Sequence, residues 1–283
     1  MFRIICILFL LSQLDLVANH LKLNLQKALQ QKLVKASAMS LGSYQDYCMN
    51  FNIQNLGKDS LIILVEAGRR LNSINEQEQD ILIVKEELIA LSNHQTKTLK
   101  LKGYCCQSSH RAPSLNAKYD LNKLGDSDLV SVARYLNKNC FNIDIEQHAI
   151  WAISDKKLTA NISSQSDTNS LSLRQLVANL KGEKLPWYMI KNQSYISRNG
   201  EIHIIPTYLI ANLKYNNDTE GYAMLSILDE KGNKTCLTKG EWLKLGSNIN
   251  YAVNLPIKNL EKGKYKLIFQ TRDREILTED FEI

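Results

Sequence analysis

Hydrophobic and polar residues alternate along much of this chain, which is typical of β-strands that bury one face. The alternation is clear in residues 47–54, while residues 61–65 form a continuous apolar run between turn signals, as expected for a central strand. Residues 81–84 and 98–101 continue this pattern. Short strands separated by polar turns predict an antiparallel sandwich rather than a chain of βαβ units.

Residues 19–41 carry two patterns. Leucines alternate with other residues from 21 to 25, whereas residues 28–33 place apolar side chains at helical spacing. The segment is therefore open to interpretation as a strand or as a helix.

Helical spacing takes over in the middle of the chain. Asp126 can cap a helix, because apolar residues at i, i+3, i+4 and i+7 follow it in residues 129–136. A later helix follows a Ser/Asn/Asp-rich loop, with Ser172 and Gln175 at capping-box spacing and Gly182 as its end. The sequence thus predicts a helical insert between strand-rich regions.

Strands return from about residue 202. Residues 222–228 with the turn at 229–233 predict a hairpin, and residues 250–255, 264–270 and 275–283 complete a second sandwich. The stretch Gly-Lys-Tyr-Lys-Leu-Ile-Phe at 263–269 resembles a late strand of fibronectin-type modules of exported proteins. The resemblance implies a spacer or docking module.

Together these patterns predict a mainly β protein with a helical insert (α+β), in which two antiparallel β-sandwich-like modules flank a short helical segment. We expect an N-terminal immunoglobulin-like sandwich over residues 19–102 and a helical, thioester-like segment over 103–200. A C-terminal fibronectin-like sandwich is expected over residues 201–283.

The N-terminus predicts export. Arg3 precedes an apolar run at residues 4–11 that is too short to span a bilayer, and Leu-Val-Ala at 16–18 offers a small-residue cleavage site. We interpret residues 1–18 as a signal peptide, with a short buried helix as the alternative. No later segment is apolar enough to span a membrane. The expected location is therefore secreted, periplasmic or at the cell surface.

Charge and composition argue for an ordinary globular chain. The net charge is +6, and 44% of residues are hydrophobic and 23% charged. Because lysines and acids are interspersed rather than gathered in one basic stripe, the sequence does not indicate nucleic-acid binding. The expected partner is a protein or a surface ligand, and no cofactor is expected.

Removal of the signal peptide leaves an odd number of cysteines, so at least one thiol is unpaired or bonded to another molecule. A bridge from Cys48 to Cys105 or Cys106 would suit two facing sheets. Alternatively, all of the cysteines, including Cys140 and Cys236, are small buried hydrophobes.

Adjacent thiols, a carboxamide, two histidines and a tryptophan gather between residues 103 and 155. This segment contains Tyr104-Cys105 and, downstream, Gln-His-Ala-Ile-Trp at residues 147–151. The two motifs resemble those of the thioester domains of bacterial surface adhesins. The resemblance is confined to this central segment.

In that family a cysteine thiol and a glutamine carboxamide condense with loss of ammonia, leaving an internal thioester that a host amine can open. The resemblance implies that Cys105 is the thiol partner and Gln147 the acyl partner. Glu146 stands where the family commonly has threonine. The surrounding candidate binding residues are Cys106, His110, His148 and Trp151.

Other interpretations stay open. Asp144 and Gln147 have capping-box spacing, which would give Gln147 a local structural role at the start of a helix. As an alternative function, Cys105 or Cys106 would be the nucleophile of a cysteine-dependent enzyme, with His110 or His148 as base. The histidines lack paired ligand spacing, so no metal site is predicted. We favour an exported, non-enzymatic binding or adhesion protein.

Overall fold

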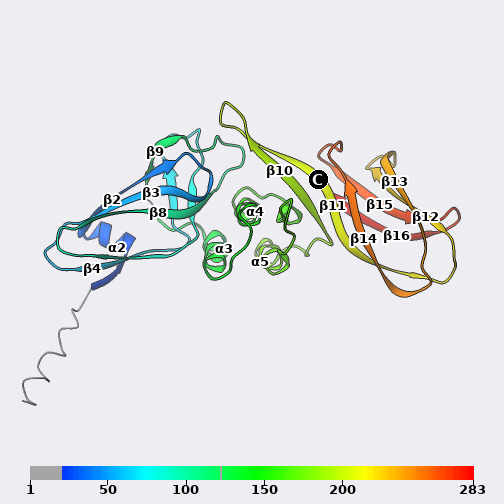
Figure 1. The fold of residues 1–283 in the computed structure, drawn as a ribbon, viewed down its shortest axis with the longest axis horizontal. Coiled ribbons are helices and arrows are strands. Elements are labelled where there is room, and N and C mark those ends of the chain that lie inside the picture. The colour runs from blue at the N-terminus through cyan, green and yellow to red at the C-terminus, as the bar shows by residue number, and fades with distance from the viewer. Residues whose placement is uncertain (1–20, 122) are drawn as a thin grey trace, which may run out of the picture.

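The computed structural model describes residues 21–121 and 123–283. A β-rich N-terminal module, a layer of helices and a C-terminal sandwich follow one another along the long axis of the molecule (Figure 1). Of the described residues, 48% are strand and 17% helix, which confirms the predicted mainly β fold with a helical insert. The predicted signal peptide lies outside the described residues.

The N-terminal module is a closed barrel with a three-stranded sheet beside it. The barrel order is β2-β3-β8-β6-β5-β9, and the sheet order is β1-β4-β7. The barrel strands are β2 (Val34–Leu41), β3 (Gln45–Asn55), β5 (Arg70–Ser73), β6 (Ile81–Ile83), β8 (Thr96–Cys105) and β9 (Leu115–Asp120). Beside them lie β1 (Leu21–Asn24), helix α2 (Leu25–Gln30), β4 (Leu61–Val65) and β7 (Glu87–Leu91).

One hydrophobic core joins the barrel to this sheet. Phe51 and Ile53 of β3 and Ile63 of β4 are fully buried in it. Each such side chain contributes roughly 1.5–3 kcal/mol relative to an exposed position. The alternating pattern that predicted these strands therefore reports the buried face. The ambiguous first segment contains both a helix and strands.

The N-terminal module differs from the immunoglobulin-like sandwich expected over residues 19–102. Strand β8 runs past that boundary to Cys105, and β9 returns to pair with β2 and β5, which closes the barrel. In β9 only Tyr119 is buried, so this strand carries almost no hydrophobic signal. Closure therefore depends on a strand that the sequence pattern does not reveal.

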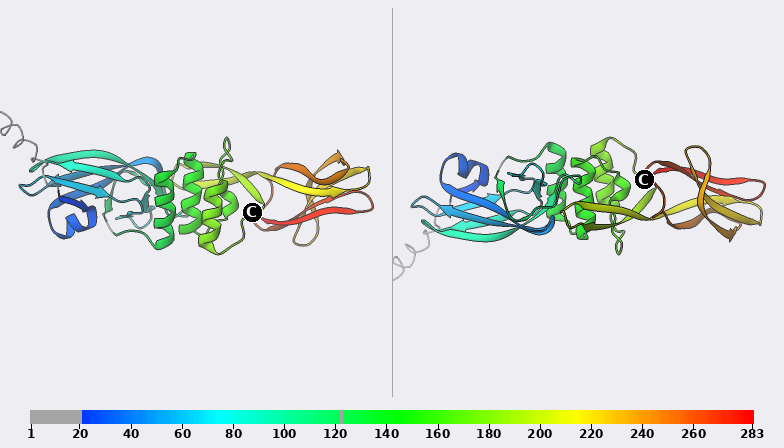
Figure 2. Two further views of the ribbon diagram at one scale, coloured as in Figure 1. Left: turned by 90° about the horizontal axis from the view of Figure 1, so that it is seen from below. Right: turned by 90° about the horizontal axis from the view of Figure 1, so that it is seen from above.

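Helices α3 (Ser127–Lys138), α4 (Ile143–Ser154) and α5 (Leu171–Lys181) pack side by side between the two β-rich modules (Figure 2). The Asp126 carboxylate accepts a hydrogen bond from the Leu129 amide at 2.9 Å, which confirms the predicted cap of α3. Gly182 ends α5 with a φ of 67°, also as predicted. A short 3-10 turn, η1 (Thr159–Asn161), links α4 to α5.

Two predicted capping boxes do not form. Helix α4 begins one residue before Asp144, because Asn142 is its N-cap and accepts from the Asp144 amide at 3.0 Å. Helix α5 has Ser170 as its N-cap, ahead of Ser172. These shifts release Gln147 from a capping role and place it inside the helix, on a buried face.

The C-terminal module is a sandwich of two sheets, with strand orders β10-β11-β14 and β13-β12-β15-β16. Its strands are β10 (Tyr188–Ile196), β11 (Ile202–Asn217), β12 (Tyr222–Asp229), β13 (Lys234–Trp242), β14 (Gly246–Pro256), β15 (Lys264–Gln270) and β16 (Glu275–Glu282). The predicted hairpin is confirmed by the pairing of β12 with β13. Stacked and edge-on aromatic rings fill the core around Tyr215, Tyr251 and Phe269. The module begins at β10, ahead of the expected boundary at 201.

The hairpin of β10 and β11 reaches back across the helices toward the barrel (Figure 1). At its tip the Gly200 carbonyl accepts from the Ala112 amide at 2.7 Å. Further along, the Tyr44 and Ser194 hydroxyl groups lie 3.4 Å apart. The hairpin therefore connects the first module to the last and runs along the segment that carries the candidate site. None of the described helices has the length and apolar character needed to cross a membrane.

Candidate functional site

The structure brings together the two residues that the sequence predicts as a pair. Cys105 is the last residue of β8, and Gln147 lies on α4. The Gln147 Oε1 atom accepts from the Cys105 amide at 3.1 Å, and Gln147 Nε2 donates to the Cys105 carbonyl at 2.8 Å. Cys105 is 0% exposed and Gln147 1% exposed. The contact is therefore a buried pair of hydrogen bonds.

The Gln147 carboxamide contacts the end of β8, beside the first residue of its antiparallel neighbour β3. Strand β3 begins at Gln45, and the carbonyl of the preceding residue, Tyr44, also accepts from the Cys105 amide, at 3.0 Å. A residue's N–H and C=O point to the same side of a strand, so Gln147 approaches from the side that β3 has left. Its carboxamide satisfies the buried Cys105 carbonyl that would otherwise lose its partner.

Side chains on this part of β8 alternate between two cores. Cys105 belongs to the barrel core, whereas Tyr104 and Cys106 belong to the core of the helical layer. The Cys105 thiol thus lies on the barrel side of the strand. The Cys106 thiol, the alternative nucleophile, is the one that faces the helices.

Glu146 fastens the start of α4 to the same strand. Its Oε2 atom accepts from the Tyr104 hydroxyl at 2.6 Å and lies 2.7 Å from the Lys102 ammonium. Its Oε1 atom accepts from the Phe141 amide at 3.1 Å. Burial raises the pKa of Tyr104, and the Glu146 charge adds to that rise, so the phenol stays a donor. These contacts of the buried Glu146 carboxylate hold Gln147 opposite Cys105.

The thiols of this region are free and protonated. Cys48, Cys105 and Cys106 are buried free thiols, so the predicted bridge from Cys48 is not formed; its thiol donates to the Gly103 carbonyl at 3.4 Å. Burial raises the pKa of Cys48 and of Cys106 to about 12 and that of Cys105 well above its ordinary value. We call these three residues the buried thiols. Cys140 is exposed.

The two histidines of the region make other contacts. His148 is buried, its Nδ1 atom lies 3.0 Å from the Ser163 carbonyl, and burial lowers its pKa. The backbone carbonyl of His110 accepts from Gln79. Within residues 21–121 and 123–283, no hydrogen bond joins a cysteine thiol to a histidine ring. The geometry therefore lends no support to a cysteine–histidine catalytic pair.

Trp151, one turn of α4 beyond Gln147, lines a cavity of about 290 Å³. Its ring stacks on Tyr44, with ring centres 6.1 Å apart, and is tilted against His148 at 5.8 Å. The indole is 1% exposed, and its N–H has no hydrogen-bond partner among the described residues. Two of the four predicted binding residues, Trp151 and His148, therefore share a cavity, which Cys106 and His110 do not line.

Most of this cavity comes from residues that belong to no predicted site. They are Ser108, Ser109, Lys157, Asn161, Asn192, Ile202, Ile204, Pro206, Lys262 and Ile283. They come from the loop after β8, the turn around η1, strands β10 and β11, and the chain beyond β14. These residues have in common only their position in the fold, so sequence spacing does not identify them.

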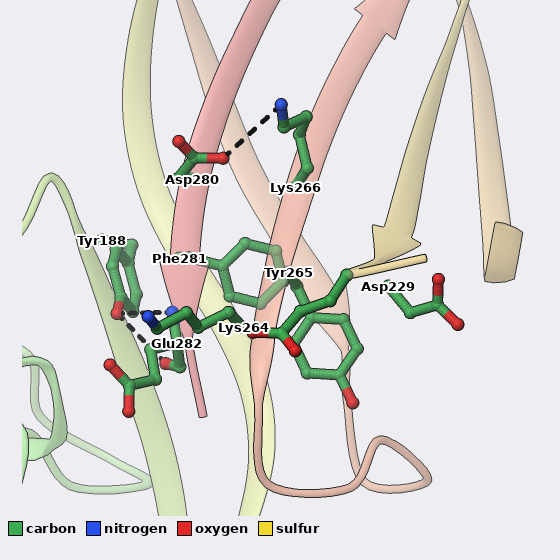
Figure 3. A pocket seen from close by; sticks show the side chains of 9 residues that line it. Tyr188, Asp229, Lys264, Tyr265, Lys266, Asp280, Phe281 and Glu282 are labelled. Atoms are coloured by element: carbon green, nitrogen blue, oxygen red, sulfur yellow. Dashed lines mark hydrogen bonds and ion pairs between the residues drawn. The ribbon is translucent and has the colours of Figure 1, made fainter. Parts of the chain in front are cut away.

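A larger cavity of about 690 Å³ lies in the C-terminal sandwich (Figure 3). The Tyr188 hydroxyl donates to the Glu282 carbonyl and accepts from the Glu282 amide, at 3.1 and 2.9 Å. The residues that line this cavity include both acids and lysines, among them Lys266 and Asp280, whose Nζ and Oδ1 atoms lie 3.9 Å apart. No predicted site residue lines it. In the described part of the chain, no group of three or more His, Cys, Asp or Glu side chains could hold a metal ion.

No protein-family profile and no curated protein sequence matches the chain. Among solved structures, the chain is similar to DesR, a beta-glucosidase from Streptomyces venezuelae in complex with D-glucose, at 9% sequence identity and a TM-score of 0.17. The match covers 88% of this chain and 47% of that chain, so the chain spans about half the length of that structure. A TM-score of this size does not indicate a shared fold.

Proposed function

We propose that this chain is an exported binding protein of the cell surface or extracellular space, in which Cys105 and Gln147 form an internal thioester. The observation that carries the proposal is the buried two-point hydrogen bond between the Gln147 carboxamide and the Cys105 peptide group. These residues are 42 positions apart in sequence, and the fold places the peptide group of the cysteine in contact with the carboxamide of the glutamine. The export signal expected at residues 1–18 supports the location.

The hydrogen bonds also suit the chemistry. The Cys105 amide donates to Gln147 Oε1, which draws electron density from the carboxamide carbon and stabilises negative charge that develops on the oxygen. The thiol adds to that carbon, the Sγ–Cδ bond forms, and the Cδ–Nε2 bond breaks. The thiol proton leaves with the amide nitrogen as ammonia, so atoms and charge balance.

One movement must precede this step. The Cys105 thiol lies in the barrel core, so its side chain has to rotate toward the Gln147 carboxamide before the bond can form. Rotation between staggered side-chain positions needs no break in the strand. The protonated state of the buried thiol makes the reaction slow, and preorganisation by Glu146 offsets part of that disadvantage.

The rest of the chain is suited to presenting such a site. A primary amine on a partner would attack the thioester carbon, forming an amide to Gln147 and releasing the Cys105 thiol with the amine proton. The C-terminal sandwich, joined to the barrel by the β10–β11 hairpin, would act as a spacer or docking module. This role is non-enzymatic, because the site is consumed once.

Intact mass of the purified protein under denaturing conditions tests the proposal. We expect a mass lower by one ammonia than the mass calculated from the sequence of the purified chain. Cys105→Ser and Gln147→Glu should each restore the full mass, because each removes one reacting group without a large change in volume. Cys106→Ser is the matched control and should keep the ammonia loss. A full, unmodified mass in the unaltered protein would overturn the thioester.

A further inference from the structure

The cavity beside Trp151 has the composition of a binding site. It lies where the helical layer, the loop after β8 and the β10–β11 hairpin meet. A buried donor normally has a partner, and the Trp151 indole N–H, in a side chain that is 1% exposed, has none among the described residues. Trp151 also lines the cavity, so this unpartnered donor belongs to a residue of the cavity wall.

Charge around the cavity favours an anion. Lys157 and Lys262 line it, and none of its described lining residues carries an acidic side chain. Lys157 is 39% exposed and lies 3.6 Å from Asp155, a loose ion pair. Asp155 is itself engaged by the Ser108 amide at 3.1 Å and by the Ser108 hydroxyl. The Lys157 ammonium therefore retains donors for a ligand.

Part of the lining is apolar. Ile202, Ile204 and Pro206 of β11 line the cavity together with the Trp151 ring. At about 290 Å³ the space equals that of roughly ten water molecules at about 30 Å³ each, enough for one amino-acid side chain and part of its backbone. A short aliphatic stem that ends in a negative group would suit this mixture of apolar and positively charged lining residues.

We propose that this cavity binds a carboxylate presented by an acidic side chain of a partner polypeptide. The indole N–H donates to the carboxylate, Lys157 and Lys262 supply the opposite charge, and the β11 wall contacts the methylene groups. The cavity adjoins the Cys105 region, since Tyr44 stacks on Trp151 and accepts from the Cys105 amide. Carboxylate binding does not require a thioester, so the two proposals can fail separately.

The test uses the full chain labelled with ¹⁵N and follows the indole N–H signals of Trp151, Trp187 and Trp242. The probe is N-acetyl-L-glutamate, and N-acetyl-L-glutamine is its neutral isostere. We expect the glutamate probe to shift the Trp151 signal saturably. The other two should not move, because Trp187 already donates to the Asp280 carbonyl at 2.8 Å and Trp242 is 69% exposed elsewhere. Trp187→Phe and Trp242→Phe variants assign the three signals.

Lysine variants connect the shift to this cavity. Lys157→Gln and Lys262→Gln should each weaken binding of the glutamate probe, by up to about fivefold for a partly exposed ion pair. Lys264→Gln, at a lysine that lines the other cavity, is the matched control and should leave the affinity unchanged.

Three results would overturn the proposal: no saturable shift of Trp151, an equal shift with the glutamine probe, or an affinity unaffected by both cavity lysines. The intact mass of the same samples reports the thioester independently. A sample can therefore bind the probe with an unmodified mass, or lose ammonia without binding the probe.

Discussion

Tyr104→Phe tests whether Glu146 fastens α4 to β8. The change removes only the hydroxyl that donates to the buried Glu146 carboxylate at 2.6 Å, and the aromatic ring stays in the helical core. A hydrogen bond to a charged group contributes about 1.5–3 kcal/mol to stability. Lys102 and the Phe141 amide still contact the carboxylate in the variant, so we expect a loss of about 2 kcal/mol in the free energy of unfolding.

A second buried tyrosine provides the control. The Tyr119 hydroxyl donates to the Gln79 carbonyl at 2.9 Å, a neutral acceptor. Tyr119→Phe should therefore cost about 1 kcal/mol, the usual value for a neutral hydrogen bond. The two variants remove the same atom from buried rings and differ in the charge of the acceptor.

Urea unfolding followed by intrinsic fluorescence measures both losses. With a slope of about 2 kcal/mol per molar urea, a loss of 2 kcal/mol lowers the midpoint by about 1 M. If the modules unfold in separate transitions, the Tyr104→Phe effect is read from the transition of the helical layer, which the fluorescence of Trp151 reports. A Tyr104→Phe midpoint equal to or above that of Tyr119→Phe would refute the role given to Glu146.

The remaining predictions concern packing and titration. A maleimide should label Cys140 rapidly in the native protein and Cys48 and Cys106 only after unfolding, while Cys105 stays blocked as long as the thioester holds it; rapid native labelling of a buried thiol would contradict their burial. Gly103→Ala should lower the free energy of unfolding by about 1–3 kcal/mol, because a Cβ there would lie 2.5 Å from the Ile81 side chain. Gly221→Ala meets only ordinary contacts and should cost little, so equal costs for the two variants would contradict the close approach at Gly103. Since burial lowers the folded-state pKa of His148 below its ordinary 6.5, the unfolded state takes up the proton first, and stability should fall as pH drops below about 6.5. A His148→Gln variant should show a flatter decline, and an unchanged slope would argue against a buried neutral ring.

The regular elements follow from local chemistry, which is why the sequence predicts them. Alternation in residues 47–54 lies within β3, and the apolar run at 61–65 is β4. The Asp126 cap of α3 and the Gly182 stop of α5 each act on backbone groups only a few residues away in their own helix, so no tertiary contact is needed to recognise them. The same is true of the β12–β13 hairpin, because its turn residues are adjacent.

Barrel closure and the start of α4 depend on non-local contacts. Strand β9 is held by pairing with β2 and β5 rather than by its own buried face, so its exposed sequence resembles a loop. At α4, both Asn142 and Asp144 are residue types that can cap a helix, and the structure uses Asn142. Sequence spacing alone does not rank the two.

The site divides in the same way. The sequence motifs pick out Cys105 and Gln147, and the structure places them in contact. The positioning contacts around Glu146 and the cavity residues of the β10–β11 hairpin come from segments far apart in the chain. The side of β8 on which each thiol lies is likewise set by the two cores, not by the Cys-Cys doublet itself.

Mass spectrometry before and after treatment with methylamine tests the thioester most directly. We predict that the untreated protein lacks one ammonia, and that methylamine adds its full mass at Gln147 while one further thiol becomes available to an alkylating reagent after denaturation. Peptide mapping should place the new amide at Gln147 and the released thiol at Cys105. An untreated protein of full mass, with every thiol available from the start and no methylamine incorporated, would contradict the account.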